Sequence, residues 1–370
     1  MSIADIRGVA YLTNPKIDGR RAALELVPLL IINALTVSSL YWAQSVVGLA
    51  AAELGVSAVV ALTPGATLLG YALGVAGLAI LSRDLSRTSG LVLHGACLSV
   101  AQCLTAVAPN AATVAIACLA IGAGCSLTQR VIVIATTLVT PARQAQAIGM
   151  AIASGLVGIV IARAAVADLA ALIGWRTMFL AAAVTTFSAC LAFAGLRSRA
   201  GVASDRQAEL PSPMVLLRTV PALRVAALQQ AVVFAGFNLG WALFPAASQA
   251  SAGARAAIAS AGAMAALLSG RACLTNPPRA VALFGLSSVV AAAGVAGLAF
   301  ATRMSASSPV TYGAMVLLEL GTQVALVANQ ASAQAGAPSV PVRGRLAAIM
   351  TTIAFGGGAL GAVIGNLVQR

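Results

Sequence analysis

QAIGMAIASGLVGIVIARAAVADLAALIGWRTMF, residues 146–179, is the stretch that decides the fold. It runs without a charge from Gln146 to Ala162, and its apolar character continues past Arg163 and Asp168. A helix needs about 20 mainly apolar residues to cross a bilayer, so this stretch predicts a transmembrane helix. Ser154, Gly158 and Ala162 recur at every fourth position and would let a second helix pack closely.

The composition of the whole chain also indicates a membrane protein. Of its 370 residues, 60% are hydrophobic and 8% are charged, whereas soluble domains carry roughly 25% charged residues. The net charge of +13 comes from arginines that recur singly or in pairs between apolar runs, and this spacing does not fit a nucleic-acid-binding face. The six cysteines lie inside apolar runs without metal-site or disulfide spacing, so we expect no metal and no cofactor.

The apolar runs predict an all-α membrane protein with about eleven transmembrane helices in two bundles. The predicted spans are 23–50, 57–81, 90–108, 111–139, 145–172, 174–196, 221–250, 255–272, 279–301, 309–336 and 345–368. The longest polar interval between spans separates the sixth from the seventh. We therefore expect a cytoplasmic N-terminal segment (1–22), a six-helix bundle (23–196), a cytoplasmic linker (197–220) and a five-helix bundle (221–370).

The distribution of Lys and Arg predicts the orientation, because cytoplasmic loops carry the excess of positive charge. The N-terminus and the loops on its side of the membrane hold sixteen of these residues, and the opposite loops and the C-terminus hold four. This places the N-terminus in the cytoplasm, and an odd number of spans places the C-terminus in the periplasm.

A weak internal repeat supports two related halves. Residues 141–162 and 341–362 align without gaps and share a Pro-x-Arg turn that leads into a glycine-rich helix. Such repeats are common in transporters.

A short charged turn follows the second predicted span in the sequence GYALGVAGLAILSRDLSRTSG, residues 70–90. Gly70 and Gly74 form a smooth helical face, and Arg83, Asp84 and Arg87 form the turn.

These motifs resemble those of the major facilitator superfamily, in particular its bacterial drug and sugar efflux branch. GYALG with its charged turn is similar to the loop motif between helices 2 and 3. Residues 146–179 resemble the fifth helix with its GWR exit, and ELGTQVALVANQ (319–330) resembles the tenth helix. The resemblance implies a two-bundle fold in which helices 1, 4, 7 and 10 line the substrate path. The twelfth helix of the family has no counterpart among the predicted spans.

Polar and aromatic residues inside those four spans are the candidate substrate-contacting residues, because polar groups in a span tend to face a cavity or a partner helix. Arg163 in the fifth span joins them. The alternative interpretation is hydrogen bonding between helices of a static bundle. The candidates are Asn33, Gln44, Gln129, Arg130, Arg163, Gln230, Phe234, Phe237, Trp241, Gln323 and Gln330.

Glu319 is the candidate proton-coupling residue, because a carboxylate inside a span is costly unless it is protonated or paired. The alternative is a permanent ion pair with Arg130 or Arg163. Asp168 and His94 are weaker candidates for the same role.

The sequence thus predicts a secondary transporter of the bacterial inner membrane that exports a small amphipathic solute or drug in exchange for protons. Its partners would be this solute, protons and the lipid bilayer, and we expect a monomer. No catalytic triad or phosphate loop is visible, so we do not expect an enzyme. The alternative is a truncated, transport-incompetent relative, a scaffold or a degenerate gene product. The missing twelfth helix, Arg83 in the loop motif and Cys118, where the family carries an arginine, favour this alternative.

Overall fold

The computed structural model describes residues 19–55, 58–81, 88–139, 143–198, 212–247, 250–275, 277–304, 308–334 and 340–368. Within these ranges the regular structure is entirely helical. The helices are α1 Gly19–Leu54, α2 Ala58–Leu81, α3 Thr88–Val107, α4 Ala111–Cys125, α5 Leu127–Thr137, α6 Gln144–Ala164, α7 Val166–Ile173, α8 Trp175–Ser198, α9 Pro213–Thr219, α10 Pro221–Ala247, α11 Ala252–Thr275, α12 Pro277–Met304, α13 Ser308–Gln334 and α14 Val340–Val368.

The number of membrane crossings agrees with the sequence pattern. In the described part of the chain, ten helical units are long and apolar enough to span a bilayer, with α4 and α5 counted as one unit. The apolar stretch Leu62–Leu78 of α2 is a shorter addition. The prediction of an all-α membrane protein with about eleven helices is therefore confirmed.

Two predicted spans are broken in the structure. The span 111–139 divides at Ser126, whose hydroxyl donates to the carbonyl oxygen of Ala123 at 2.6 Å. The span 145–172 divides at Ala165, and α7 then ends at Gly174, whose φ of +84° favours glycine. Side-chain bonds to the backbone and single-residue changes of φ do not alter hydropathy, so the sequence pattern missed both breaks.

Helix α9 lies in the segment that the sequence analysis assigned to the linker. Ser212 caps it by accepting a hydrogen bond from the backbone N–H of Val215 at 3.3 Å, and Pro213 follows directly. Serine followed by proline is a recognised helix start. This signal was present in the sequence, but seven residues are too few for a hydrophobic period to stand out.

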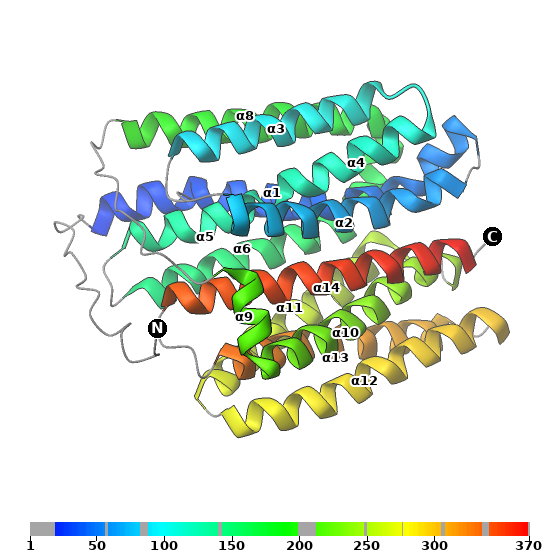
Figure 1. The fold of residues 1–370 in the computed structure, drawn as a ribbon. Coiled ribbons are helices and arrows are strands. Elements are labelled where there is room, and N and C mark those ends of the chain that lie inside the picture. The colour runs from blue at the N-terminus through cyan, green and yellow to red at the C-terminus, as the bar shows by residue number, and fades with distance from the viewer. Residues whose placement is uncertain are drawn as a thin grey trace.

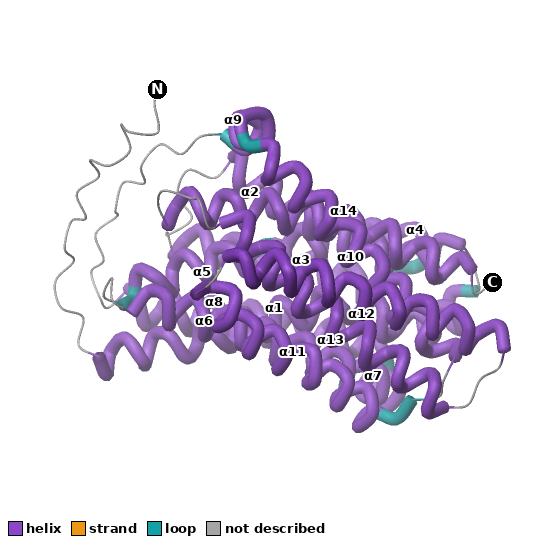
Figure 2. The backbone as a smooth tube through the Cα atoms, turned by 90° about the horizontal axis from the view of Figure 1, so that it is seen from below, coloured by secondary structure: helices purple, strands orange, loops and turns teal. Residues whose placement is uncertain are grey.

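The transmembrane helices form two groups that run roughly parallel to one long axis (Figure 1). Helices α1 to α8 pack among themselves and form the N-terminal group, and α10 to α14 form the C-terminal group. Helix α2 lies along α14, and α6 lies along α11, so these two pairs join the groups. Figure 2 shows the same assembly from below. Helices α1, α10 and α14 all finish at one end, which we call the distal end.

Glycines set the closest approaches between helices. Gly158 of α6 lies against the carbonyl group of Ala34 in α1, and Gly361 of α14 lies against that of Ala235 in α10. The α1–α6 and α10–α14 pairs thus repeat one packing arrangement in the two groups. Gly70 and Gly74 of α2 lie against α4 in the same way, at Leu119 and Ala123. A methyl group at any of these positions would meet the neighbouring backbone.

We expect Gly158→Ala and Gly361→Ala to destabilise the protein by about 1–3 kcal/mol, because each new Cβ forces two backbones apart. Gly149→Ala in α6 and Gly356→Ala in α14 are matched controls, since no atom lies within 4 Å of a Cβ there. These control substitutions should leave the free energy of unfolding unchanged or raise it by up to about 1 kcal/mol, because alanine has a higher helix propensity than glycine. Thermal unfolding in detergent measures all four, and equal midpoints would contradict the packing role.

Candidate functional site

Glu319 lies inside the C-terminal group. Its side chain on α13 is 1% exposed. The indole Nε1 of Trp241 donates a hydrogen bond to its Oε2 at 2.8 Å, and Nε2 of Gln323 donates to its Oε1 at 3.2 Å. Gly262 of α11 leaves the space that the carboxylate occupies. Glu319 is therefore enclosed by three helices rather than exposed to lipid.

Arg163 connects the two groups near the distal end of α6. Its side chain is 4% exposed, and its Nη1 donates to Oε1 of Gln44 on α1 at 2.7 Å. The guanidinium carbon lies 5.0 Å from the ring centroid of Tyr41 and 3.9 Å from that of Trp241. Because Trp241 belongs to α10, this stacking interaction crosses between the groups.

Trp241 is thus shared by the two charged residues. Its ring lies against Arg163, and its Nε1 donates to Glu319. Among the described residues, no cationic nitrogen lies within 4.0 Å of the Glu319 carboxylate, so it forms no direct ion pair with Arg163 here.

A row of aromatic rings extends from Trp241. Phe237 lies 6.5 Å from Trp241, and Phe234 stacks on Phe237 at 5.6 Å, measured between ring centroids. Phe355 of α14 continues the row at 4.6 Å from Phe234 and 4.4 Å from Tyr71 of α2. The row therefore reaches from the C-terminal group into the N-terminal group.

Two of the candidate polar residues hold helices together. Nδ2 of Asn33 on α1 donates to the carbonyl oxygen of Ala151 on α6 at 2.7 Å. Gln230 on α10 accepts a bond from Asn329 on α13 at 3.4 Å, and Asn329 also donates to the carbonyl oxygen of Ala226 at 2.6 Å. For Asn33 and Gln230, the geometry favours helix-to-helix hydrogen bonding.

The remaining candidates on α5 and α13 lie away from Glu319. Nε2 of Gln129 donates to the hydroxyl of Tyr71 at 3.4 Å, and Arg130 lies against Gly90 of α3. Gln330 is half-buried near the C-terminal end of α13. His94 on α3 lies 3.2 Å from the hydroxyl of Ser126, which makes it a contact between α3 and the α4–α5 junction.

Arg83, Asp84 and Arg87 of the loop motif lie outside the described residues. Gly70 and Gly74, which precede them, are described and pack on α4 as stated above.

A second polar contact joins the groups at the distal end. Arg255 of α11 forms an ion pair with Asp168 of α7 at 3.1 Å. Its Nε also donates to the carbonyl oxygen of Arg163 at 2.9 Å, and its Nη1 donates to that of Ala250 at 2.6 Å. Arg255 is one of the four basic residues predicted for the C-terminus and the loops opposite the N-terminus, and the sequence does not reveal its partner because Asp168 lies 87 residues away.

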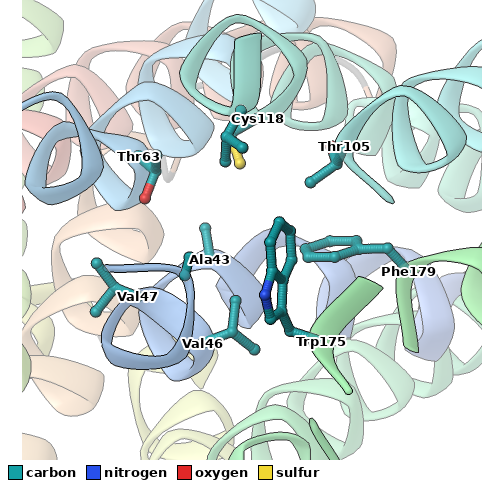
Figure 3. A pocket seen from close by; sticks show the side chains of 10 residues that line it. Ala43, Val46, Val47, Thr63, Thr105, Cys118, Trp175 and Phe179 are labelled. Atoms are coloured by element: carbon teal, nitrogen blue, oxygen red, sulfur yellow. The ribbon is translucent and has the colours of Figure 1, made fainter. Parts of the chain in front are cut away.

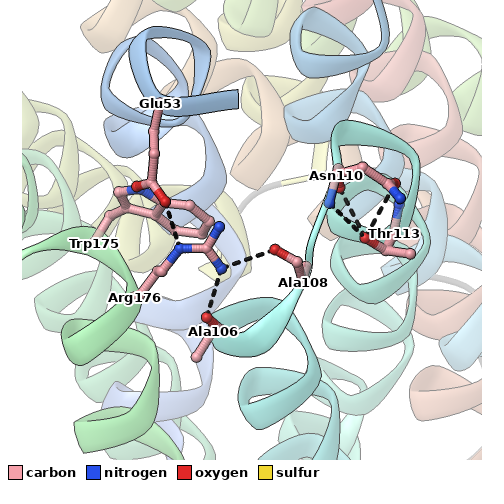
Figure 4. A network of polar contacts seen from close by, with 7 residues as sticks. All are labelled: Glu53, Ala106, Ala108, Asn110, Thr113, Trp175 and Arg176. Atoms are coloured by element: carbon pink, nitrogen blue, oxygen red, sulfur yellow. Dashed lines mark hydrogen bonds and ion pairs between the residues drawn. The ribbon is translucent and has the colours of Figure 1, made fainter. Parts of the chain in front are cut away.

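The GWR motif is held by a carboxylate that the sequence analysis did not select. Glu53 at the end of α1 accepts hydrogen bonds from Trp175 at 2.6 Å and from Arg176 at 2.7 Å. Arg176 also donates to the carbonyl oxygens of Ala106 and Ala108 (Figure 4). This network fixes α8 to the ends of α1 and α3.

A small cavity lies beside this network, in the N-terminal group. Its volume is about 10 Å³, and Trp175, Phe179, Thr63 and Cys118 are among its lining residues (Figure 3). A cavity of roughly 10–15 Å³ holds about one water molecule. This cavity is therefore too small to hold an organic solute.

Comparisons with known proteins identify the architecture. The family model of the Major Facilitator Superfamily matches residues 29–362. This chain belongs to the Major Facilitator Superfamily. As a member of this family it is a multi-pass membrane transporter of small molecules and not an enzyme.

Solved structures of superfamily transporters have the same fold. A bacterial homolog of the human lysosomal transporter Spinster, in an inward-facing and occupied conformation, matches with a TM-score of 0.73 and 17% identity. The match covers 95% of this chain and 82% of that one. The xylose transporter XylE from E. coli, in a partially occluded inward-open conformation, matches with a TM-score of 0.61 and 12% identity, over 94% of this chain and 97% of that one. No curated protein matches this superfamily member.

We expect Arg255→Gln to loosen the distal contact between the groups more than Asp168→Asn does. The ion pair is partly exposed, because the Asp168 side chain is 62% exposed. Such pairs contribute about 1 kcal/mol or less to stability. Arg255→Gln also removes two bonds to carbonyl oxygens, each worth about 1 kcal/mol. Hydrogen–deuterium exchange of residues 163–173 measures the loosening, and an equal increase in both variants would contradict this ranking.

Proposed function

We propose that this transporter exports a small amphipathic solute in exchange for protons, and that Glu319 carries the proton. The supporting observation is the environment of its carboxylate. It is buried in a transmembrane helix, and its hydrogen-bond donors Trp241 and Gln323 are both neutral. A buried carboxylate without a bonded cation is stable as a neutral acid and, with the right donors, as an anion. Such a group can therefore gain and lose a proton during a transport cycle.

Trp241 links the protonation of Glu319 to the contact between the two groups. Trp241 is the neighbour that Arg163 and Glu319 share, because its Nε1 donates to Glu319 and its ring lies against the guanidinium of Arg163. When Glu319 is charged, it attracts Arg163 and orients the indole that Arg163 contacts. When Glu319 binds a proton, this attraction disappears and Trp241 loses a charged acceptor. Protonation would thus favour separation of α6 from α10.

The solute would bind between the groups, beside Arg163 and the aromatic row. Phe234, Phe237 and Trp241 offer apolar ring surface, and Gln44 and Gln323 offer polar contacts next to the two charged residues. This combination suits a solute with an apolar body and a polar end. Alternating separation of the groups at the two ends of the bundle would move the solute across the membrane.

We place the protein in the bacterial inner membrane as a monomer, with the N-terminal end of α1 in the cytoplasm. The excess of Lys and Arg in the loops at that end supports this orientation. Helix α1 begins at one end of the bundle and α14 finishes at the other (Figure 1). The C-terminus would therefore be periplasmic.

We expect Glu319→Gln to abolish the dependence of transport on a pH gradient and to leave the protein folded. Glutamine keeps the shape of the protonated acid but cannot release a proton. Solute flux into proteoliposomes, with and without an imposed pH gradient, measures the effect. Glu319→Asp should keep part of the dependence.

Glu53→Gln is the matched control for the loss of a carboxylate, because Glu53 lies in the structural network at the end of α1. It should keep the pH dependence of the wild type. Gradient-driven transport that persists in Glu319→Gln would exclude Glu319 as the proton carrier and redirect the search to Asp168 and His94.

We expect an alkaline phosphatase fused after Arg370 to be active and a green fluorescent protein at the same position to be dark, because only the former matures in the periplasm. The reverse pattern would contradict the proposed orientation. A fusion in the linker after Ala208 provides the control, since it should give the opposite pattern.

A further inference from the structure

Two donor atoms of Arg163 are buried without a hydrogen-bond partner. Nη1 of its guanidinium donates to Gln44, but Nε and Nη2 bond to no atom of the described chain. The side chain is 4% exposed. Buried polar groups are almost always hydrogen-bonded, and a buried cation with missing partners is costly.

The positions of these two atoms restrict what can bind them. In a planar guanidinium group, the hydrogens of Nε and Nη2 point in parallel from one edge. This edge matches the two oxygens of a carboxylate and forms two parallel charge-assisted hydrogen bonds. The unbonded atoms of Arg163 are therefore the pair that binds a carboxylate bidentately.

No carboxylate of the described residues bonds to these two atoms. Glu319 shares the neighbour Trp241 with Arg163, but among the described residues no cationic nitrogen lies within 4.0 Å of its carboxylate. Both of its oxygens accept hydrogen bonds from neutral donors. Asp168 is bound to Arg255. Nε2 of Gln44 is a further buried donor without a partner. The unsatisfied atoms next to Arg163 thus include donors on two residues, which an anion would satisfy.

The faces of the guanidinium are covered by aromatic rings. Tyr41 of the N-terminal group and Trp241 of the C-terminal group both lie against it, and Phe237 lies next to Trp241. A solute that binds the edge of Arg163 would place its remaining atoms next to these rings, where apolar or aromatic surface is favourable.

We infer that Arg163 recognises the substrate and that the substrate is an organic acid, whose carboxylate binds Nε and Nη2 while its apolar or aromatic body lies against Trp241 and Phe237. This inference rests on the proposed function, because it names the class of solute for the same site.

Binding of paired ligands to the purified protein in detergent tests this inference. The probes are 2-naphthoate, 4-phenylbenzoate and decanoate, each compared with its primary amide, which keeps the shape and removes the charge. We expect the wild type to bind at least one acid roughly ten- to a hundred-fold more tightly than its amide, as expected for hydrogen bonds to a charged group. Isothermal titration calorimetry measures both affinities.

Three variants assign this preference to Arg163. Arg163→Gln should abolish it. Arg163→Lys keeps the charge but not the parallel donors, so it should keep only part of it. Arg303→Gln removes an exposed arginine in the last turn of α12 and should keep all of it.

The inference is wrong if the wild type binds no acid more tightly than its amide, or if the preference is intact in Arg163→Gln. If Arg163→Gln does not fold, Arg163→Lys decides, and an undiminished preference in that variant overturns the bidentate geometry. The binding assay uses no pH gradient, so it is independent of proton coupling. A dependence of transport on the pH gradient that persists in Glu319→Gln, while the preference for acids follows Arg163, would reject only the proton carrier.

Discussion

The cost of a charged side chain in hydrocarbon is the constraint on which the interior of this protein depends. Arg163 and Glu319 are both almost completely buried in transmembrane helices. Each is stabilised by neutral partners: aromatic rings and Gln44 for the cation, and Trp241 and Gln323 for the anion. Because these partners come from α1, α10 and α13, the two helix groups must meet at this point for the charges to be tolerated.

Close helix packing within each group positions the residues that meet at this point. Gly158 and Gly361 let α6 and α14 approach α1 and α10 at backbone distance in the two groups. In a membrane, hydrophobic burial gives little driving force for helix association, and small residues promote it because they let helix backbones approach closely. The same packing places Arg163 beside Gln44 and holds the aromatic row of α10 against α14. A transporter must also loosen such contacts, and single hydrogen bonds and ring contacts between the groups are weak enough to break during a cycle.

The chemistry of the site follows from which atoms are satisfied and which are not. The oxygens of Glu319 have donors, whereas two nitrogens of Arg163 have no acceptor. Both proposals rest on this asymmetry: Glu319 is proposed to carry the proton, and Arg163 is proposed to bind an anion. Trp241 contacts both residues and is therefore the structural link between them.

The sequence by itself determined the class of structure and the family. Apolar runs of sufficient length identify transmembrane helices because hydropathy is a local property, and the GWR and glycine motifs occupy contiguous residues. Their charged or aromatic side chains inside apolar spans also marked Glu319, Arg163 and Trp241 as candidates. It could not decide that Trp241 bridges the other two, that Arg255 reaches Asp168, or that Glu53 holds Trp175 and Arg176. A period of 3.6 residues gives the direction of a side chain around its own helix, but not which helix lies opposite. These contacts join residues 78 to 123 positions apart, and only the packing of the helices brings them together.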